Sequence, residues 1–281
     1  MKVSFIGIGA IGLPMALQIR HAGHDVTGID LSPASLANAE AQQLPAVNDF
    51  AAAPQADVVV VMVATPQQLA ALVESVGAAA RGQVWIIMST VGPDSVRQQG
   101  EILQRAGARV IDAPVTGGVA RARTGSLVLF VSGNTADIEP VMPVLAAMGN
   151  PRIVGAHLGD GQSIKVVNQH LCSVNLVAAA EALALARGLG LDPAAVLPLI
   201  EKGAAGSWML SDRGPRMLGD TDVEVTSAVT IFVKDSGLVA DAGKACGVAL
   251  PLLDQAHDRF QRAADAGLGA RDDSRVIETW R

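Results

Sequence analysis

The sequence predicts an α/β fold, in which an N-terminal, doubly wound Rossmann-type domain is followed by an all-α C-terminal domain and a long helix joins the two. Three observations support this prediction. Short apolar runs alternate with helical segments over residues 1–160, which is typical of a parallel sheet built from βαβ units. A glycine-rich turn follows the first apolar run, and nearly everything after Gly161 has helical character. We therefore expect domains at 1–160 and 161–281.

The composition indicates a folded chain with a large apolar core. Of the 281 residues, 50% are hydrophobic and 17% are charged, and the mean hydropathy is +0.36, which argues against disorder. The longest uninterrupted apolar run, 58–64, is much shorter than the ~20 residues that cross a bilayer, so we expect no membrane association. The surplus apolar content has to be buried inside the subunits or between them, and we expect a homodimer or homotetramer.

Charge, cysteine and tyrosine content exclude several classes of protein. The net charge of −6, without any basic block, is unsuited to binding nucleic acid or an anionic membrane. Cys172 and Cys246 form no CxxC pair, which favours a reducing cytoplasm. Two cysteines cannot build a four-cysteine zinc site, and we expect no metal. Because the chain has no tyrosine, the Tyr–Lys chemistry of short-chain dehydrogenases is impossible.

A predicted strand–turn–helix–strand unit opens the chain. A β-rich run at Lys2–Ile6 leads into the sequence Gly-Ile-Gly-Ala-Ile-Gly, a helical pattern extends to about His21, and a second strand covers Asp25–Ile29. Glycines permit the tight turn, let a pyrophosphate approach bare backbone, and bring it to the N-terminus of the helix. The residues of this turn are therefore predicted to bind a dinucleotide: Gly7, Gly9, Ala10, Ile11 and Gly12.

The residue after the second strand, Asp30, indicates which dinucleotide is bound. A carboxylate at this position accepts hydrogen bonds from both hydroxyls of the adenosine ribose and repels a 2′-phosphate. Leu31 follows, with no arginine beside it to hold such a phosphate. We predict that the cofactor is NAD, with Asp30 and Leu31 at its adenosine end.

The next predicted strands end in small or hydroxylated residues. They cover 58–63 and 84–88, with Val63-Ala64 and Thr90 at their ends, and a further strand at 109–111 leads toward Thr116. In open α/β sheets, ligands bind beyond the carboxyl ends of the strands, so we expect Ala64, Thr90 and Thr116 around one crevice. With Thr116, the following Gly117 and Gly118 offer a hydroxyl and unhindered backbone N–H groups, which suit a carboxylate.

A group of polar residues lies where the second predicted domain begins. A strand at 127–132, a helix at 135–148 and a strand at 152–154 are predicted to complete the first domain. A long Ala/Leu-rich helix is predicted from Gly161 to about Gly188. Near its start, Lys165, Asn168 and Gln169 stand at positions i, i+3 and i+4, so their side chains leave one face. We interpret this face as the catalytic edge of a two-domain oxidoreductase.

Four motifs together resemble the β-hydroxyacid dehydrogenase family, which includes 3-hydroxyisobutyrate dehydrogenases and tartronate semialdehyde reductases. In the order of the family, they lie at 7–16, at 112–118 with 125–127, at 159–169 and at 232–235. Within the family, the segments 204–209, 227–235 and 271–274 look most like the L-threonate dehydrogenase branch.

The resemblance implies NAD-dependent oxidation of a hydroxyl on a short hydroxy acid, with Lys165 as the catalytic residue. It further implies a helical substrate and oligomerisation domain, and a cofactor whose nicotinamide end touches Thr90 and Lys234. The substrate ligands that it implies are Thr116, Gly117, Gly118, Asn168 and Gln169. Two of them depart from the family pattern, since Thr116 replaces the usual serine and Gln169 a frequent asparagine. The substrate therefore stays open between L-threonate or a related sugar acid, 3-hydroxyisobutyrate and tartronate semialdehyde.

Several alternatives remain. Lys234 could pair with a carboxylate, such as Asp235, instead of touching the cofactor, and Lys165 could lie along its helix with the charged end in water. A non-catalytic NAD-binding protein and an imine reductase are two other classes with this architecture. In both of them we expect the family lysine to be lost or replaced, so the presence of Lys165 favours a dehydrogenase.

Overall fold

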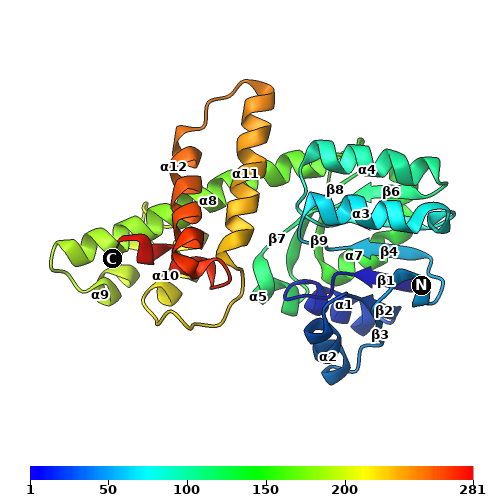
Figure 1. Cartoon of the computed structure of the whole chain (residues 1–281), viewed down its shortest axis with the longest axis horizontal. Helices are drawn as coiled ribbons and strands as arrows, with labels where there is room; N and C mark the ends of the chain where they lie inside the picture. The colour runs from blue at the N-terminus through cyan, green and yellow to red at the C-terminus, as the bar shows by residue number, and fades with distance from the viewer. Residues whose placement is uncertain (281) are drawn as a thin grey trace. The chain divides into compact units, whose positions relative to one another are not determined.

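The structure is a computed structural model that describes residues 1–280. The chain divides by its internal contacts into two compact units, Met1–Lys165 and Val166–Arg281. The first unit contains the sheet and the second is helical (Figure 1).

The N-terminal unit is built on one nine-stranded sheet with the order β3-β2-β1-β4-β5-β6-β8-β7, and β9 pairs with β8. The strands are β1 (Lys2–Ile6), β2 (Asp25–Ile29), β3 (Ala46–Val47), β4 (Val58–Val61), β5 (Val84–Ile87), β6 (Arg109–Asp112), β7 (Val115–Thr116), β8 (Leu127–Ser132) and β9 (Gly149–Gly155). The strands from β3 to β6 are parallel, with Val3 opposite both Val26 and Val58, whereas β8 runs antiparallel to β6 and β7. The strand order reverses at β1 and β4, which is the switch point where such sheets bind ligands.

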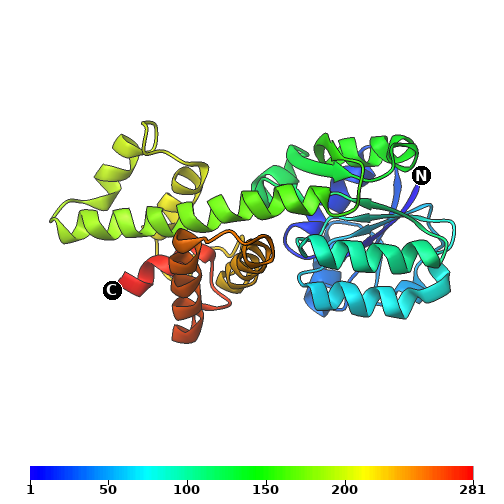
Figure 2. The ribbon, with the colours of Figure 1, turned by 90° about the horizontal axis from the view of Figure 1, so that it is seen from above.

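Helices cover both faces of this sheet (Figure 2). On one face, α1 (Gly12–His21) and α7 (Met142–Met148) contribute to a core that includes Val58 and Val60. On the other face, α3 (Pro66–Val76) and α4 (Pro93–Arg105) pack around Val59 and Val61. All four valines of β4 are fully buried, which explains why this strand is an unbroken apolar run.

The remaining elements of this unit are short. They are α2 (Pro33–Ala41), α5 (Gly118–Arg123), α6 (Thr135–Ile138) and the 3₁₀ turns Phe50–Ala52, Gly77–Ala80 and Glu139–Val141. The single helix expected at 135–148 was wrong, because α6, a 3₁₀ turn and α7 share this segment. Pro140 and Pro143 lie in it, and proline has no N–H to donate in a continuous helix. The strand expected at 152–154 is longer, as β9 begins at Gly149.

The helical unit packs around α8 (Asp160–Gly188), whose first residues, up to Lys165, belong to the first unit. The other helices are α9 (Pro193–Ile200), α10 (Trp208–Met217), α11 (Val229–Cys246) and α12 (Pro251–Ala263), followed by a π-helical turn at Ala264–Leu268 and a 3₁₀ segment at Asp273–Trp280. The core combines Leu176 and Leu183 of α8 with Phe232 and Phe260, whose stacked rings have centroids 5.0 Å apart. Among residues 1–280, α8 alone is long and apolar enough to cross a membrane, but its buried side belongs to this core.

An ion-pair network fixes the last segment of the helical unit. Asp272 and Asp273 are fully buried, and each faces an arginine of α10. Arg213 binds Asp273 through two hydrogen bonds of 2.9 Å, and Arg216 Nη1 lies 2.9 Å from Asp272 Oδ2. Both carboxylates are therefore neutralised where they are buried, as a buried charge requires.

Candidate active site

The turn between β1 and α1 has the shape that a pyrophosphate needs. Gly7 has a φ of +90°, and a Cβ there would lie 2.4 Å from the carbonyl oxygen of Met62. A Cβ on Gly12 would lie 1.8 Å from the carbonyl oxygen of Gly7, whereas a Cβ on Gly9 would have no described atom within 4 Å. Helix α1 begins without a side-chain cap, so no capping side chain occupies its N-terminus. These features fit a dinucleotide phosphate.

Asp30 lies directly after β2, half-buried, with its Oδ1 accepting a hydrogen bond of 2.9 Å from the backbone N–H of Ser32. This contact fixes the orientation of the carboxylate. Leu31 is 87% exposed. Asp30 and Leu31 therefore lie at the end of the second strand, where dinucleotide-binding folds bind the adenosine ribose.

Other predicted cofactor residues lie along the same edge of the sheet, because the parallel strands all end there. Val63 and Ala64 follow β4, and Thr90 follows β5. The backbone N–H groups of Ala64 and Thr65 both donate to Gln68 Oε1, at 2.8 and 3.2 Å, in a capping box that starts α3. The N–H of Ala64 is therefore already engaged in the protein.

Thr116, Gly117 and Gly118 form the end of β7 and the start of α5, and all three are half-buried. Gly117 and Gly118 have φ values of +132° and +67°, in the region that favours glycine. A Cβ on Gly117 would also lie 2.7 Å from Arg121 Cδ. The structure thus places all three beyond the carboxyl end of β6, as expected for this segment.

Lys165 is 6% exposed and lies on the second turn of α8. The start of this helix is held by Asp112, the last residue of β6, which is fully buried. Asp112 Oδ2 accepts hydrogen bonds from the backbone N–H groups of Gly159 and Gln162, at 3.1 and 2.9 Å, and from Ser132 Oγ at 3.2 Å. Burial raises the pKa of Asp112 to about 6, although these hydrogen bonds act in the opposite direction.

Asn168 and Gln169, further along α8, are linked to α11 within the helical unit. Asn168 Nδ2 donates to Gln169 Oε1 at 2.8 Å, and Gln169 Nε2 donates to Asp235 Oδ2. The other oxygen of Asp235 lies 2.6 Å from Lys234 Nζ. The ion pair considered as an alternative for Lys234 is therefore present, and a contact between Lys234 and the cofactor stays a prediction.

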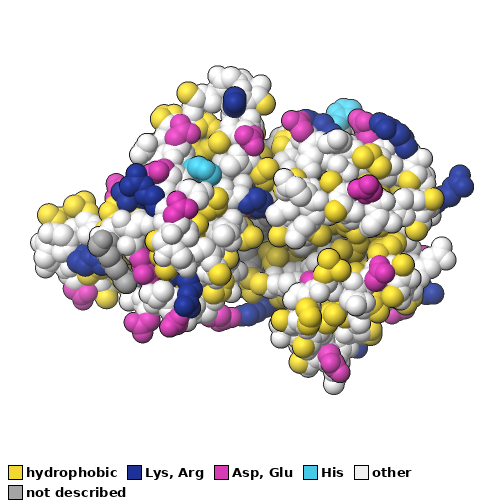
Figure 3. All heavy atoms as spheres, viewed as in Figure 1, with side chains coloured by type: hydrophobic (Ala, Val, Ile, Leu, Met, Phe, Trp, Pro, Cys, Tyr) yellow, Lys and Arg dark blue, Asp and Glu magenta, His cyan; other side chains and the backbone are white. Residues whose placement is uncertain are grey.

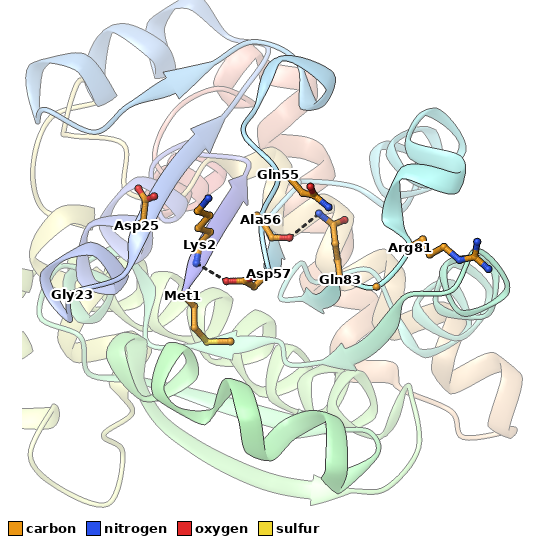
Figure 4. A pocket seen from close by; sticks show the side chains of 10 residues that line it. Met1, Lys2, Gly23, Asp25, Gln55, Ala56, Asp57, Arg81 and Gln83 are labelled. Carbon is orange, nitrogen blue, oxygen red and sulfur yellow. Dashed lines mark hydrogen bonds between the residues drawn. The ribbon is translucent and has the colours of Figure 1, made fainter.

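A separate pocket lies at the opposite edge of the sheet (Figure 4). Its lining includes Lys2, Asp25 and Gln83, at the amino ends of β1, β2 and β5. Two hydrogen bonds span it, from the N–H of Lys2 to Asp57 at 2.9 Å and from Gln83 Nε2 to the carbonyl oxygen of Ala56 at 3.1 Å. Ligands of open α/β sheets bind at the carboxyl ends of strands, so we give this pocket no part in the reaction.

On the face in Figure 3, acidic and basic side chains lie interspersed, often next to one another. Over residues 1–280, no group of three or more His, Cys, Asp and Glu side chains could hold a metal ion.

Sequence reasoning did not identify Asp112, Ser132 or Gln162 as parts of the site. The sequence offered one weak signal, since Asp112 is a carboxylate at the end of an apolar strand, whereas the full burial of Gln162 is visible only in the structure. Their partners, however, lie far away along the chain, and no local pattern predicts such contacts.

The fold and the glycine turn define a dehydrogenase that uses a nicotinamide dinucleotide. Residues 2–166 match the family described as the NAD-binding domain of 6-phosphogluconate dehydrogenase. Residues 159–280 match the family described as the NAD-binding domain of NADP-dependent 3-hydroxyisobutyrate dehydrogenase.

The similarity to known proteins covers the whole chain. An L-threonate dehydrogenase of Cupriavidus necator is 38% identical over 99% of this chain and 95% of its own length. A 2-(hydroxymethyl)glutarate dehydrogenase of Eubacterium barkeri is 32% identical over 100% and 95%. A crystal structure described as 3-hydroxyisobutyrate dehydrogenase from Salmonella typhimurium is 33% identical and superposes with a TM-score of 0.91 over 99% of each chain. The chain belongs to the 3-hydroxyisobutyrate dehydrogenase-like family of β-hydroxyacid dehydrogenases, and it is an NAD-dependent oxidoreductase.

Proposed function

We propose that the protein oxidises a hydroxyl of L-threonate or of a closely related short sugar acid, with Lys165 as the proton-transfer residue. The observation that carries the proposal is the place of Lys165, which is 6% exposed in the second turn of α8 and precedes Asn168 and Gln169 by three and four positions on the same helix. The choice of substrate is supported by the relative named L-threonate dehydrogenase, at 38% identity.

The oxidation removes a hydride from the carbinol carbon and a proton from its hydroxyl. When bound, NAD⁺ supplies the hydride acceptor. Lys165 Nζ takes the hydroxyl proton, or returns it in the reductive direction. The hydroxyl of Thr116 and the backbone N–H groups of Gly117 and Gly118 bind the carboxylate of the substrate. The amides of Asn168 and Gln169 bind its further hydroxyls, which suits a polyhydroxylated acid better than 3-hydroxyisobutyrate.

We also propose that the protein is a soluble, cytoplasmic homodimer or homotetramer. An apolar stripe on α8 supports a second copy as the partner. It consists of exposed residues spaced for one helical face: Ile164, Val167, Leu171, Ala178, Ala182, Leu185 and, just past the end of the helix, Leu189.

A substrate panel tests the proposed reaction. The protein is incubated with NAD⁺ and L-threonate, glycerate or 3-hydroxyisobutyrate, and with NADH and tartronate semialdehyde in the reverse direction. The near-ultraviolet absorbance of NADH reports turnover. We expect the highest kcat/KM with L-threonate. A higher value with 3-hydroxyisobutyrate or tartronate semialdehyde would assign the protein to that activity, and no turnover with any of these acids would support a non-catalytic NAD-binding protein.

A further inference from the structure

Gln162 is a fully buried amide in the first turn of α8, and it forms four hydrogen bonds. Its Oε1 accepts from the backbone N–H groups of Val91 and Gly92, at 3.0 and 3.1 Å. Its Nε2 donates to the carbonyl oxygen of Ser89 at 2.9 Å and to Asp112 Oδ1 at 3.0 Å. A side-chain amide has two donors and two acceptor sites, so Gln162 uses its full capacity.

The backbone allows only one orientation of this amide. Two N–H groups face its oxygen and one carbonyl oxygen faces its nitrogen. A flip of the amide would oppose donor to donor and acceptor to acceptor, and each buried polar group left without a partner costs about 1–3 kcal/mol. Gln162 is therefore a rigid link and cannot exchange between two arrangements.

Asp112 fixes the other side of the link. One carboxylate oxygen accepts from Gln162 Nε2, while the other accepts from the backbone N–H groups of Gly159 and Gln162 and so caps α8. The helix also starts in close contact with the sheet, because a Cβ on Gly161 would lie 2.3 Å from the carbonyl oxygen of Phe130. The first turn of α8 therefore has a fixed position against the ends of β6 and β8.

The residues that Gln162 joins flank two groups of the proposed reaction. Thr90 lies within the segment 89–92, whose backbone the amide holds on both sides. Lys165 follows Gln162 at i+3 on α8, so the two residues lie on neighbouring positions of one face. Both ends of this link belong to the N-terminal unit.

We propose that Gln162 is a positioning residue. It sets the placement of Lys165 relative to the segment 89–92, which contains Thr90, and hence to the nicotinamide end of the cofactor. This inference rests on the proposed role of Lys165. Loss of the link is expected to lower kcat more than cofactor affinity, since the phosphate-binding turn after β1 has no contact with Gln162 among the described hydrogen bonds.

The variant Gln162→Met tests the inference, because methionine fills a similar volume without hydrogen bonds. The matched control is Gln83→Met. Gln83 is also a buried amide, 6% exposed, which binds the carbonyl oxygen of Ala56 and the indole N–H of Trp85 at the other end of β5. We expect Gln162→Met to lower kcat about 100-fold, as a misplacement of about 1 Å can. Both variants lose hydrogen bonds of a buried amide, so we expect both to lower Tm, but Gln83→Met should leave kcat unchanged. A kcat of Gln162→Met equal to that of the control would overturn the proposal.

A second variant separates positioning from general destabilisation. In Gln162→Glu, the new carboxyl faces Asp112 and shares a proton with it as pH falls. The protonated carboxyl has one O–H and can restore one of the two hydrogen bonds that the amide nitrogen donated. The ratio of kcat in Gln162→Glu to kcat in the wild type is therefore expected to rise as the pH falls from 8 toward 6. A ratio that does not depend on pH would contradict the inference.

Hydrogen exchange at the backbone N–H groups of Val91 and Gly92 tests the link without turnover. We expect Gln162→Met to lose protection at these two positions and Gln83→Met to keep it. Unchanged protection in Gln162→Met would refute the link itself. By contrast, full activity of Lys165→Met, with protection lost in Gln162→Met, would refute the proposed role of Lys165 and leave the link in place.

Discussion

Lys165 is a residue whose removal separates chemistry from binding. Lys165→Met retains most of the apolar stem but cannot exchange a proton. We expect kcat to fall by ~10²–10⁴-fold, the usual contribution of general acid–base catalysis, while the Kd for NAD⁺ changes little. Steady-state kinetics and a binding titration measure the two quantities. The control is Lys202→Met, an exposed lysine after α9, and near-wild-type kcat in Lys165→Met would rule out the proposed role.

Asp30 is the residue that we expect to determine cofactor preference. In Asp30→Ala, the ribose loses hydrogen bonds to a charged group, and the loss of each one, worth about 1.5–3 kcal/mol, should raise KM for NAD⁺ roughly 10- to 150-fold. The repulsion of a 2′-phosphate disappears at the same time, so activity with NADP⁺ should rise. Kinetics with both cofactors measure the change. Asp25→Ala, at the exposed start of β2, should leave the preference unchanged, and a wild-type preference for NADP⁺ would contradict the assignment.

At the scale of the element, α8 gives a matched pair of glycine substitutions. A methyl group on Gly161 would lie 2.3 Å from the carbonyl oxygen of Phe130, while one on Gly188, at the other end of the helix, would meet no described atom within 4 Å. We expect Gly161→Ala to lower the free energy of unfolding by about 1–3 kcal/mol through overpacking. Gly188→Ala should be neutral or slightly stabilising. Urea unfolding compares the two, and equal effects would show that α8 is not held closely at its start.

Asp112 gives the start of α8 a defined pH dependence. Its pKa is raised from 3.8 to about 6 in the folded protein, chiefly by burial. Between these values the folded state binds a proton that the unfolded state has released. The contribution of Asp112 to the free energy of unfolding therefore falls as the pH rises from 4 to 6, by about 3 kcal/mol.

Urea unfolding of wild type and Asp112→Asn from pH 4 to pH 7 tests this dependence. Other carboxyl groups titrate in both proteins and cancel in the difference. We expect the stability advantage of the wild type to shrink as the pH rises. An advantage that stays constant or grows would contradict the raised pKa.

At the scale of the whole molecule, the apolar stripe on α8 predicts self-association. An apolar face that extends along a helix is complementary to a second copy of itself, as a two-fold interface requires. Leu185→Glu places a charge in the stripe, where Leu185 is 61% exposed, and Leu252→Glu is the control at a similarly exposed leucine of α12. Light scattering after gel filtration should show a smaller species for Leu185→Glu alone. A monomeric wild type would exclude the proposed assembly.

The sequence predicted most of the fold, because apolar periodicity and glycine turns are local signals. The bounds of β1, β2, β8 and α1 agree with the predicted ones. The break at 135–148 was missed because proline also fits the first turn of a helix. The pattern alone does not show whether a proline interrupts a helix or begins a new one.

The candidate site was predictable only in part, for a different reason. Motifs indicated where Asp30, Thr90 and Lys165 lie, but hydrogen bonds between distant residues leave no pattern in the sequence. The contact of Gln162 with Asp112 spans 50 positions. The Lys234–Asp235 pair stayed open because adjacent helical residues do not ordinarily face each other.

The burial of Asp272 and Asp273 has a consequence for how the chain is made. Their arginine partners on α10 are synthesised about sixty residues earlier and are partly or fully buried in the finished unit, where an uncompensated charge is strongly destabilising. The helical unit therefore cannot reach its final packing while the ribosome still holds residues 272–277. The sheet-containing unit has by then been outside the ribosomal tunnel for some time, so we expect the two units to fold one after the other during translation.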